Sequence, residues 1–294
     1  MVRCEGSLSA DEETRVLRTA IPNTIELRSA DGSRAEVHIR GAHVSSWRPA
    51  PDEDERLFLS ARAESSDAVA LRGGIPVIFP QFAAEGPLPR HGFARTSLWQ
   101  FVGEHREANG AAAASFTLSD SAATRAIWPV AFHATLTVRV GGAQLSVQLV
   151  VENTDDKAFH FTTALHTYLR VHNVADAELS GLKGTHYRES GAPGVLIADD
   201  AEAIHVVGEV DRVYVSAPRR LILRERARSL VIDKDGFPDV VIWNPGARAA
   251  AAMTDMEPGG ERKMLCVEAA AVQRHISLGA GERWSGTQIL AVET

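Results

Sequence analysis

The sequence predicts an all-β protein, an antiparallel sandwich or a barrel-like structure with few and short helices. Three observations carry this prediction. Apolar and polar residues alternate with a period of two along many short runs, and turn residues such as Gly, Asn and Pro separate those runs. Amphipathic patterns typical of helices longer than two or three turns are missing. Folds of this kind accommodate roughly 200 to 250 residues or more in one domain.

The chain divides into a short lead-in and one domain. Residues 1–20 are polar and match no strand pattern, so we expect them to precede the fold. Residues 21–294 have no internal repeat, no low-complexity linker and no abrupt change of composition, which favours a single domain. Within it, residues 63–74 are the best place for a short helix.

Two segments are predicted to be β-hairpins. Residues 98–118 turn at Asn109–Gly110, and residues 133–153 turn at Gly141–Gly142, because these residue pairs tolerate the positive φ angles of tight turns. Further strands are expected within residues 161–171, 212–216, 219–225, 229–234, 239–243, 263–272 and 287–292.

The composition limits the classes of partner. A formal net charge of -7 and a pI near 5.9 argue against binding to nucleic acid or to an anionic membrane, so an anionic ligand must meet a local positive patch. Cys4 and Cys266 form neither a disulfide framework nor a metal-binding spacing, which suits a reducing compartment. The N-terminus has no apolar signal segment and no stretch reaches the roughly 20 apolar residues of a membrane helix. We therefore expect a cytoplasmic protein, and a monomer.

Residues 161–171, FTTALHTYLRV, contain a single histidine in a strand pattern. Alternation places His166 on one face with Thr162, Ala164, Tyr168 and Arg170. This face is more polar than a core requires and less charged than plain surface. Both a hydrogen-bonded structural histidine and a proton-transfer role remain open, because the ordinary pKa of histidine near 6.5 suits either.

Glu268 is the only charged residue between Lys263 and Arg274. A carboxylate in a buried strand must be paired, be hydrogen-bonded or shift its pKa upward. A raised pKa brings a carboxylate towards the working range of a general base. The alternative at this point is a structural ion pair with one of the many arginines.

The segment of residues 71–96, LRGGIPVIFPQFAAEGPLPRHGFART, is unlike the strands around it because its glycines and prolines prevent regular pairing. Long irregular segments within compact domains are often functional. Guanidinium groups match phosphate and carboxylate oxygens, so an anion pocket is one reading, and a solvated loop is the other. The candidate polar residues of the segment are Arg72, Gln81, Arg90, His91 and Arg95.

Two further residues are candidates for binding, and several chemistries lack their motifs. Trp243 could stack on a sugar or belong to the core, and Asp211 could accept hydrogen bonds from ligand hydroxyls or only begin a strand. There is no HExxH, GxGxxG, Walker loop or GxSxG motif, and no Cys/His spacing for zinc. We expect no metal and no organic cofactor.

Six ordered motifs resemble one family. "RGGIPVIFPQF", "HGFAR", "TALHTYLRV", "DRVY", "FPDVVIWNP" and "CVEAA", spread over residues 72–270, resemble the glucose-6-phosphate 1-epimerases, or hexose-6-phosphate mutarotases, of the aldose 1-epimerase superfamily. The closing "GERWSGTQIL" resembles the last strand of that family. The loop before "HGFAR" departs from the family in being short and carrying Arg90, and residues 1–20 match nothing in it.

The resemblance implies a large antiparallel β-supersandwich of the galactose mutarotase-like type and an isomerase that interconverts the anomers of a hexose 6-phosphate, with glucose 6-phosphate as the first expectation. It implies that His166 and Glu268 are the acid and the base. It further implies a substrate-binding set of Arg72, Gln81, Arg95 and Asp211, with the arginines on phosphate, to which His91 and Arg90 are added in supporting roles.

The residue types suit this reaction. Opening a pyranose requires removal of the proton from the C1 hydroxyl and protonation of the ring oxygen, and our hypothesis is that Glu268 is the base and protonated His166 the acid. Two alternatives are an aldose 1-epimerase that acts on unphosphorylated sugars and a non-catalytic protein that binds or senses carbohydrate.

Overall fold

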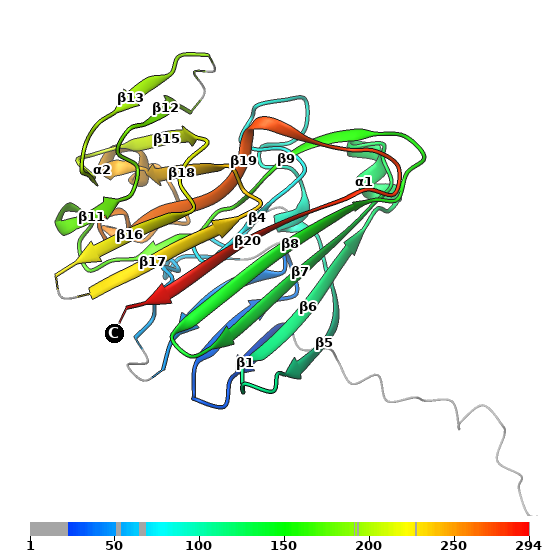
Figure 1. Ribbon diagram of the computed structural model, residues 1–294, viewed down its shortest axis with the longest axis horizontal. Coiled ribbons are helices and arrows are strands. Elements are labelled where there is room, and N and C mark those ends of the chain that lie inside the picture. The colour runs from blue at the N-terminus through cyan, green and yellow to red at the C-terminus, as the bar shows by residue number, and fades with distance from the viewer. Residues whose placement is uncertain are drawn as a thin grey trace, which may run out of the picture.

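The structure is a computed structural model that describes residues 23–50, 54–64, 69–190, 192, 194–226 and 228–293. Strands dominate it (Figure 1), and every pairing between its named strands is antiparallel, which confirms the predicted fold class. The predicted lead-in lies outside the described residues.

The described strands form three sheets. The first consists of β1 (Thr24–Arg28), β2 (Arg34–His38) and β3 (His43–Arg48). The second has the order β13 (Ile197–Asp199), β12 (Thr185–Glu189), β15 (Val210–Val215), β18 (Asp239–Asn244), β19 (Met264–Leu278), β9 (Phe159–Leu165) and β4 (Val77–Ile78), and β10 (Tyr168–Arg170) also pairs with β19. The third has the order β14 (Ala203–His205), β11 (Ala177–Ser180), β16 (Arg220–Glu225), β17 (Arg228–Asp235), β20 (Arg283–Val292), β8 (Gln144–Asn153), β7 (Phe132–Gly141), β6 (Ala112–Ser119) and β5 (Gln100–Arg106).

The helices are few and short, as predicted. They are α1 (Ala122–Ile127), α2 (Gly246–Ala250) and the 3-10 turns η1 (Ala94–Thr96), η2 (Val174–Asp176) and η3 (Gly260–Lys263). In the described part of the chain, no helix combines the length and the apolar character that crossing a bilayer would require. The helix expected within residues 63–74 is absent from the described residues of that range, while residues 65–68 lie outside them.

Both predicted hairpins are present. Arg106 lies opposite Ala112, so β5 and β6 turn around the predicted Asn109–Gly110. In the second hairpin Gly141 still pairs with Gln144, so the turn consists of residues 142–143, one position later than predicted. Gly142 takes a φ of 61°, which a residue without a side chain adopts at little cost.

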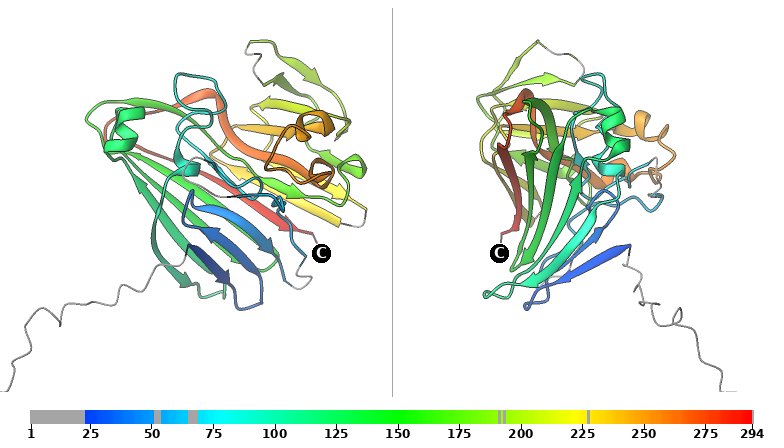
Figure 2. Two further views of the ribbon diagram at one scale, coloured as in Figure 1. Left: turned by 180° about the vertical axis from the view of Figure 1, so that it is seen from behind. Right: turned by 90° about the vertical axis from the view of Figure 1, so that its right-hand side faces the viewer.

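The main core lies between the sheets, whose layered arrangement the two views of Figure 2 show from the back and from the side. Buried and partly exposed residues alternate along β7 and β8, whose inner faces supply the apolar layer. The strand β19 differs, because residues 264–272 are buried on both of its faces. Its inner face meets β20, where the side chain of Gln288 binds the carbonyl of Val267.

The irregular segment 71–96 covers the outer face of β9 and β19. β4, within it, pairs with β9, and the backbone N–H of Tyr168 donates to the carbonyl of Gly74. Two glycines allow its close approach, because a Cβ on Gly73 would lie 2.3 Å from the carbonyl oxygen of Phe58 and one on Gly92 would lie 2.1 Å from that of Phe79. The segment therefore forms an ordered cover over the second sheet.

Candidate active site

His166 and Glu268 face each other across two antiparallel strands. Leu165 lies opposite Ala269 in the pairing of β9 with β19, and Tyr168 lies opposite Cys266 in the pairing of β10 with β19. The same register places His166 opposite Glu268, in the short break between β9 and β10. Nδ1 of His166 lies 3.2 Å from Oε1 of Glu268. Sheet geometry thus brings together two side chains that are far apart in the sequence.

A neighbouring row of the same sheet face adds the next side chains. Trp243 pairs with Cys266 and with Asp211, so Tyr168, Cys266, Trp243 and Asp211 lie in one line across four strands. This row is two residues further along each strand than the row of His166 and Glu268, and it therefore projects from the same face. The polar face predicted for His166 and Tyr168 is real, although both side chains are buried.

These side chains form the floor of a cavity of about 380 Å³. That volume lies within the range of small-molecule sites, about 300 to 1,000 Å³. The cavity brings together seven of the eight residues predicted for the site, namely His166, Glu268, Arg72, Arg90, His91, Arg95 and Asp211. Trp243 and Met253 also line it. The half-buried Trp243 therefore faces the cavity rather than the main core.

Gln81 is the predicted residue that does not line the cavity. Its side chain is buried, its amide nitrogen donates to the carbonyl of Leu88 at 2.9 Å, and its amide oxygen accepts from the N–H of the same residue at 2.9 Å. Both ends of the amide are thus used within the segment, and the expected contact of Gln81 with the substrate stays a prediction. In this structure Gln81 holds the loop that carries Arg90.

Burial sets the protonation of the central pair. It raises the pKa of Glu268 well above the usual value, and the charge of Asp211 raises it further. Burial also holds the pKa of His166 well below its usual value, with further lowering by His91, Arg95 and Arg72. Both side chains are therefore driven towards their uncharged forms. No arginine pairs with Glu268 among the described residues, which removes the structural ion-pair reading.

Nδ1 of His166 has no aligned hydrogen bond among the described residues. Although Nδ1 lies 3.2 Å from the carboxylate, it is not aligned for a hydrogen bond, and among the described residues it has no other partner. The second carboxylate oxygen of Glu268 is likewise buried without a hydrogen-bond partner in the described part of the chain. Buried polar atoms of this kind call for a ligand or for protons to exchange.

The other end of the cavity is positively charged. Arg72 donates from Nε and Nη2 to Oδ2 of Asp255 at 3.2 and 3.0 Å, and from Nη1 to the hydroxyl of Tyr168 at 3.1 Å. Although burial opposes it, Tyr168 and Asp255 raise the pKa of Arg72 above its usual value. Arg72 is thus a fixed positive charge at the wall of the site.

Arg90 and Arg95 lack such compensation. Arg95 is partly buried and donates to the backbone carbonyl of Arg90 at 3.2 Å. Within the described ranges no carboxylate lies within 4 Å of either guanidinium. Burial, together with the charges of Arg72 and Arg90, lowers the pKa of Arg95. Three clustered guanidinium groups with one carboxylate partner favour the binding of an anion.

Asp211 and His91 complete the polar lining. Burial raises the pKa of Asp211 to about 6, although its hydrogen bond with Ser190 and the charge of Arg90 act in the opposite direction. Burial and the nearby arginines lower the pKa of His91 to about 3, so His91 is neutral. Its Nδ1 accepts from the N–H of Ala83 at 3.3 Å, and its ring meets that of His166 edge-on at 5.7 Å. Neutral His91 is therefore a packing support for His166.

One group of three buried side chains could offer metal ligands in the described part of the chain. The donor atoms of His166, Cys266 and Glu268 lie within 4.8 Å of one another. Burial and then the charge of Glu268 raise the pKa of the Cys266 thiol well above its usual value, so the thiol keeps its proton. Metal ions bind the thiolate rather than the thiol. A metal ion would have to displace that proton before Cys266 could bind it.

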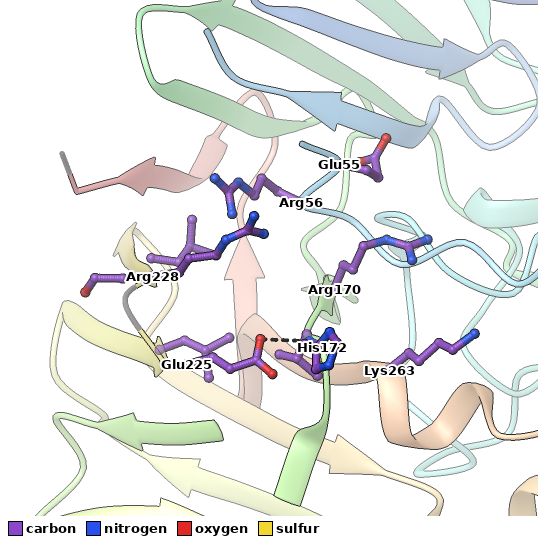
Figure 3. A pocket seen from close by; sticks show the side chains of 11 residues that line it. Glu55, Arg56, Arg170, His172, Glu225, Arg228 and Lys263 are labelled. Carbon is purple, nitrogen blue, oxygen red and sulfur yellow. Dashed lines mark hydrogen bonds between the residues drawn. The ribbon is translucent and has the colours of Figure 1, made fainter. Parts of the chain in front are cut away.

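A second cavity of about 360 Å³ lies at the ends of β10, β16 and β17 (Figure 3) and includes Arg56, Arg170, Arg228 and Lys263 in its lining. Its two carboxylates are already held by backbone groups. Glu225 accepts from the N–H groups of His172 and Asn173 at 2.7 Å. Glu55 accepts from the backbone N–H groups of Trp47 and Leu57. Because both carboxylates are bound by backbone N–H groups, they are less suited to exchange protons with a ligand. The cavity at His166 and Glu268 is therefore the better candidate for an active site.

Sequence reasoning missed two functional neighbours. Tyr168 appeared in the quoted motif but carried no signal of its own, since an aromatic residue in a strand is usually core. Asp255 lies in an irregular stretch between α2 and η3, where an isolated aspartate is unremarkable. Only the fold shows that both contact Arg72.

Comparison with known proteins places these observations in context. A family model described as aldose 1-epimerase matches residues 23–291. A protein from Cenchrus ciliaris, provisionally assigned as a glucose-6-phosphate 1-epimerase, is 35% identical over 271 residues, which cover 89% of this chain and 82% of that protein. A protein with the same provisional assignment from Escherichia coli K12 is 34% identical over 81% of this chain and 79% of its own length.

Solved structures agree with the fold. The YeaD protein of Salmonella typhimurium, provisionally described as a mutarotase, superposes with a TM-score of 0.83 and 28% identity, covering 92% of this chain and 90% of that chain. A galactose mutarotase-like protein from Clostridium acetobutylicum has a TM-score of 0.75 at 14% identity, covering 92% and 95% of the two chains, and shows likeness of fold alone.

Proposed function

The chain belongs to the aldose 1-epimerase family, and from that membership we propose that it interconverts the α and β anomers of a hexose 6-phosphate, with glucose 6-phosphate as the first substrate to test. One observation carries the choice of substrate. A carboxylate and an imidazole 3.2 Å apart lie at the floor of a cavity whose wall carries three arginines and one acidic partner for them. The enzyme is an isomerase.

The reaction needs one base and one acid. Glu268 removes the proton from the C1 hydroxyl while His166 protonates the ring oxygen, which breaks the bond between C1 and that oxygen. Rotation about the C1–C2 bond presents the other face of the aldehyde, and reversal of both proton transfers closes the ring as the second anomer. Each positioned group contributes on the order of 10²- to 10⁴-fold to the rate.

The phosphate helps to set the working protonation state. Burial holds down the pKa of His166, and the charges of Arg95 and Arg72 lower it further. A bound phosphate monoester carries about -1.5 to -2 charges and offsets those of the arginines. The pKa of His166 then rises, which favours movement of the proton from Glu268 to His166. The ionised pair, carboxylate base and imidazolium acid, is the form that the mechanism requires.

The remaining lining residues position the sugar. Arg95 and Arg90 bind the phosphate, because neither has a carboxylate partner in the described part of the chain, and Arg72 assists from its contact with Asp255. Asp211 accepts hydrogen bonds from sugar hydroxyls. Trp243, which lies beside it in the same row, packs against the apolar face of the ring.

The test is a coupled assay in which freshly dissolved α-glucose 6-phosphate feeds a dehydrogenase specific for the β anomer, with and without the protein. Faster conversion supports the proposal. Free glucose, assayed in the same way, distinguishes the alternative of an epimerase for unphosphorylated sugars, since equal kcat/KM for the two substrates would remove the phosphate assignment. Binding of glucose 6-phosphate without any acceleration would indicate a non-catalytic binding protein instead.

A further inference from the structure

The ring of His166 is held by aromatic packing. It stacks on the ring of Tyr168 with centroids 4.8 Å apart and planes 10° from parallel. Trp243 meets both rings edge-on, at 5.8 Å from His166 and 5.9 Å from Tyr168. Because Nδ1 of His166 has no aligned hydrogen bond within the described residues, this packing is a main constraint on the plane of the imidazole.

Tyr168 also reaches the arginine end of the cavity. Its hydroxyl accepts from Nη1 of Arg72 at 3.1 Å, and the ring itself is only 2% exposed. The remaining donors of Arg72, Nε and Nη2, are bound to Asp255. One rigid side chain therefore touches the phosphate-binding arginine with its hydroxyl and the catalytic histidine with its face.

We propose that Tyr168 is a positioning residue that couples the phosphate end of the site to His166. The inference rests on the proposed function for its kinetic part. The hydroxyl fixes the guanidinium of Arg72, and the stacked face fixes the imidazole plane along which the proton is delivered to the ring oxygen. A phosphate bound at the arginines therefore contacts a network that already includes the acid.

Two variants separate the two halves of this role. Tyr168→Phe keeps the stacked ring and removes only the hydroxyl, so we expect kcat for glucose 6-phosphate near the wild-type value and KM raised by about 3- to 10-fold, since Arg72 keeps Asp255. Tyr168→Leu removes the face, so kcat per active site should fall by about tenfold or more for glucose 6-phosphate and for glucose alike.

The matched control is Tyr214→Phe. Tyr214 is a buried tyrosine on β15 that contacts Arg212 at 3.5 Å and donates to Asp199 at 2.6 Å, and it does not line the cavity. It repeats the combination of tyrosine, arginine and aspartate away from the site. This control should leave kcat, KM and the preference for phosphorylated sugar unchanged.

A second readout does not depend on turnover. In wild type, inorganic phosphate should shift the imidazole NMR resonances of His166, and Tyr168→Phe should reduce that shift to the part that the charge of the phosphate exerts directly. Tyr168→Leu should broaden or move the resonances even without phosphate. The inference is overturned if Tyr168→Leu keeps the wild-type kcat per active site, or if phosphate shifts His166 in Tyr168→Phe as strongly as in wild type.

The two proposals fail in different ways. If the wild-type protein accelerates anomer exchange for no sugar while phosphate still moves His166 through Tyr168, the proposed function fails and the coupling stands. If glucose 6-phosphate turns over rapidly and the coupling readouts are unchanged by both Tyr168 variants, the positioning role fails and the epimerase assignment stands.

Discussion

Nδ1 of His166 lies 3.2 Å from Oε1 of Glu268, on two antiparallel strands whose register places the residues opposite each other. Both side chains are buried, and burial moves their pKa values in opposite directions, upward for Glu268 and downward for His166. Burial therefore favours a protonated carboxyl beside a neutral imidazole, a pair that can move protons onto and off a sugar.

Replacement of the base should abolish most of the activity without removing the substrate. In Glu268→Gln we expect kcat for glucose 6-phosphate to fall on the order of 10²- to 10⁴-fold, because the amide cannot accept the C1 proton. Binding of glucose 6-phosphate, measured by calorimetry, should persist. Glu104→Gln, on the exposed face of β5, is the control that should retain full kcat. A Glu268→Gln enzyme with normal kcat would contradict the assigned base.

Loss of Arg95 should weaken the binding of the phosphate group of the substrate. Removing a charge-assisted hydrogen bond costs about 1.5–3 kcal/mol, so we expect Arg95→Ala to raise KM for glucose 6-phosphate by roughly 10- to 150-fold and not to lower kcat/KM for glucose. The control is Arg248→Ala, because the side chain of Arg248 is 94% exposed and its nearest carboxylate lies 3.7 Å away. Equal losses for both sugars in Arg95→Ala would place the phosphate elsewhere.

The pH dependence of kcat/KM should shift in Asp211→Asn. After burial, the charge of Asp211 is the second factor that raises the pKa of Glu268, so its removal lowers that pKa. The alkaline limb, where the pair loses its last proton, should move to lower pH relative to wild type. Comparison of the two proteins with one substrate cancels the ionisation of the sugar phosphate itself. An alkaline limb at the same pH as in wild type would contradict the effect of the Asp211 charge on the pKa of Glu268.

The buried carboxylate should also cost stability at high pH. The pKa of Glu268 is raised in the folded protein, so the unfolded chain releases its proton first and stability is lost as pH rises from about 4.5 towards the folded value. Glu268→Gln avoids this loss. Urea denaturation should find it more stable than wild type at pH 8 and equal at pH 4, whereas the same difference at both pH values would contradict the linkage.

The ion pair of Arg188 with Glu85, which lies in the segment 71–96, should contribute to stability in a way that depends on which partner is removed. Arg188 is 2% exposed and binds both oxygens of Glu85, at 2.9 and 2.8 Å, while the side chain of Glu85 is 25% exposed. Glu85→Ala leaves a buried guanidinium without its carboxylate and should cost about 3 kcal/mol of unfolding free energy. Arg188→Met should cost less, because Glu85 can turn to water. Equal losses in urea denaturation would refute this.

The sequence by itself determined the fold class, the strands and much of the site. Alternation of period two identified the strands and both hairpins, and it assigned His166 and Tyr168 to one face, since side-chain direction in a strand depends only on position. The isolated charge of Glu268 indicated a candidate base, and the arginines of residues 71–96 indicated a candidate anion pocket. Both can be recognised from the residues and their neighbours in the sequence. The ordered motifs then identified the family.

The contacts between residues of the site depend on the tertiary structure. The register that places Glu268 opposite His166, the contact of Tyr168 with Arg72, and the use of both ends of the Gln81 amide by Leu88 all depend on long-range pairing. The continuous apolar run of β19 fits its burial on both faces, but the fold sets what packs against each face. The physical reason is that a strand pattern specifies which face a side chain takes, whereas its partner, its desolvation and its pKa are set by whatever the fold packs against that face.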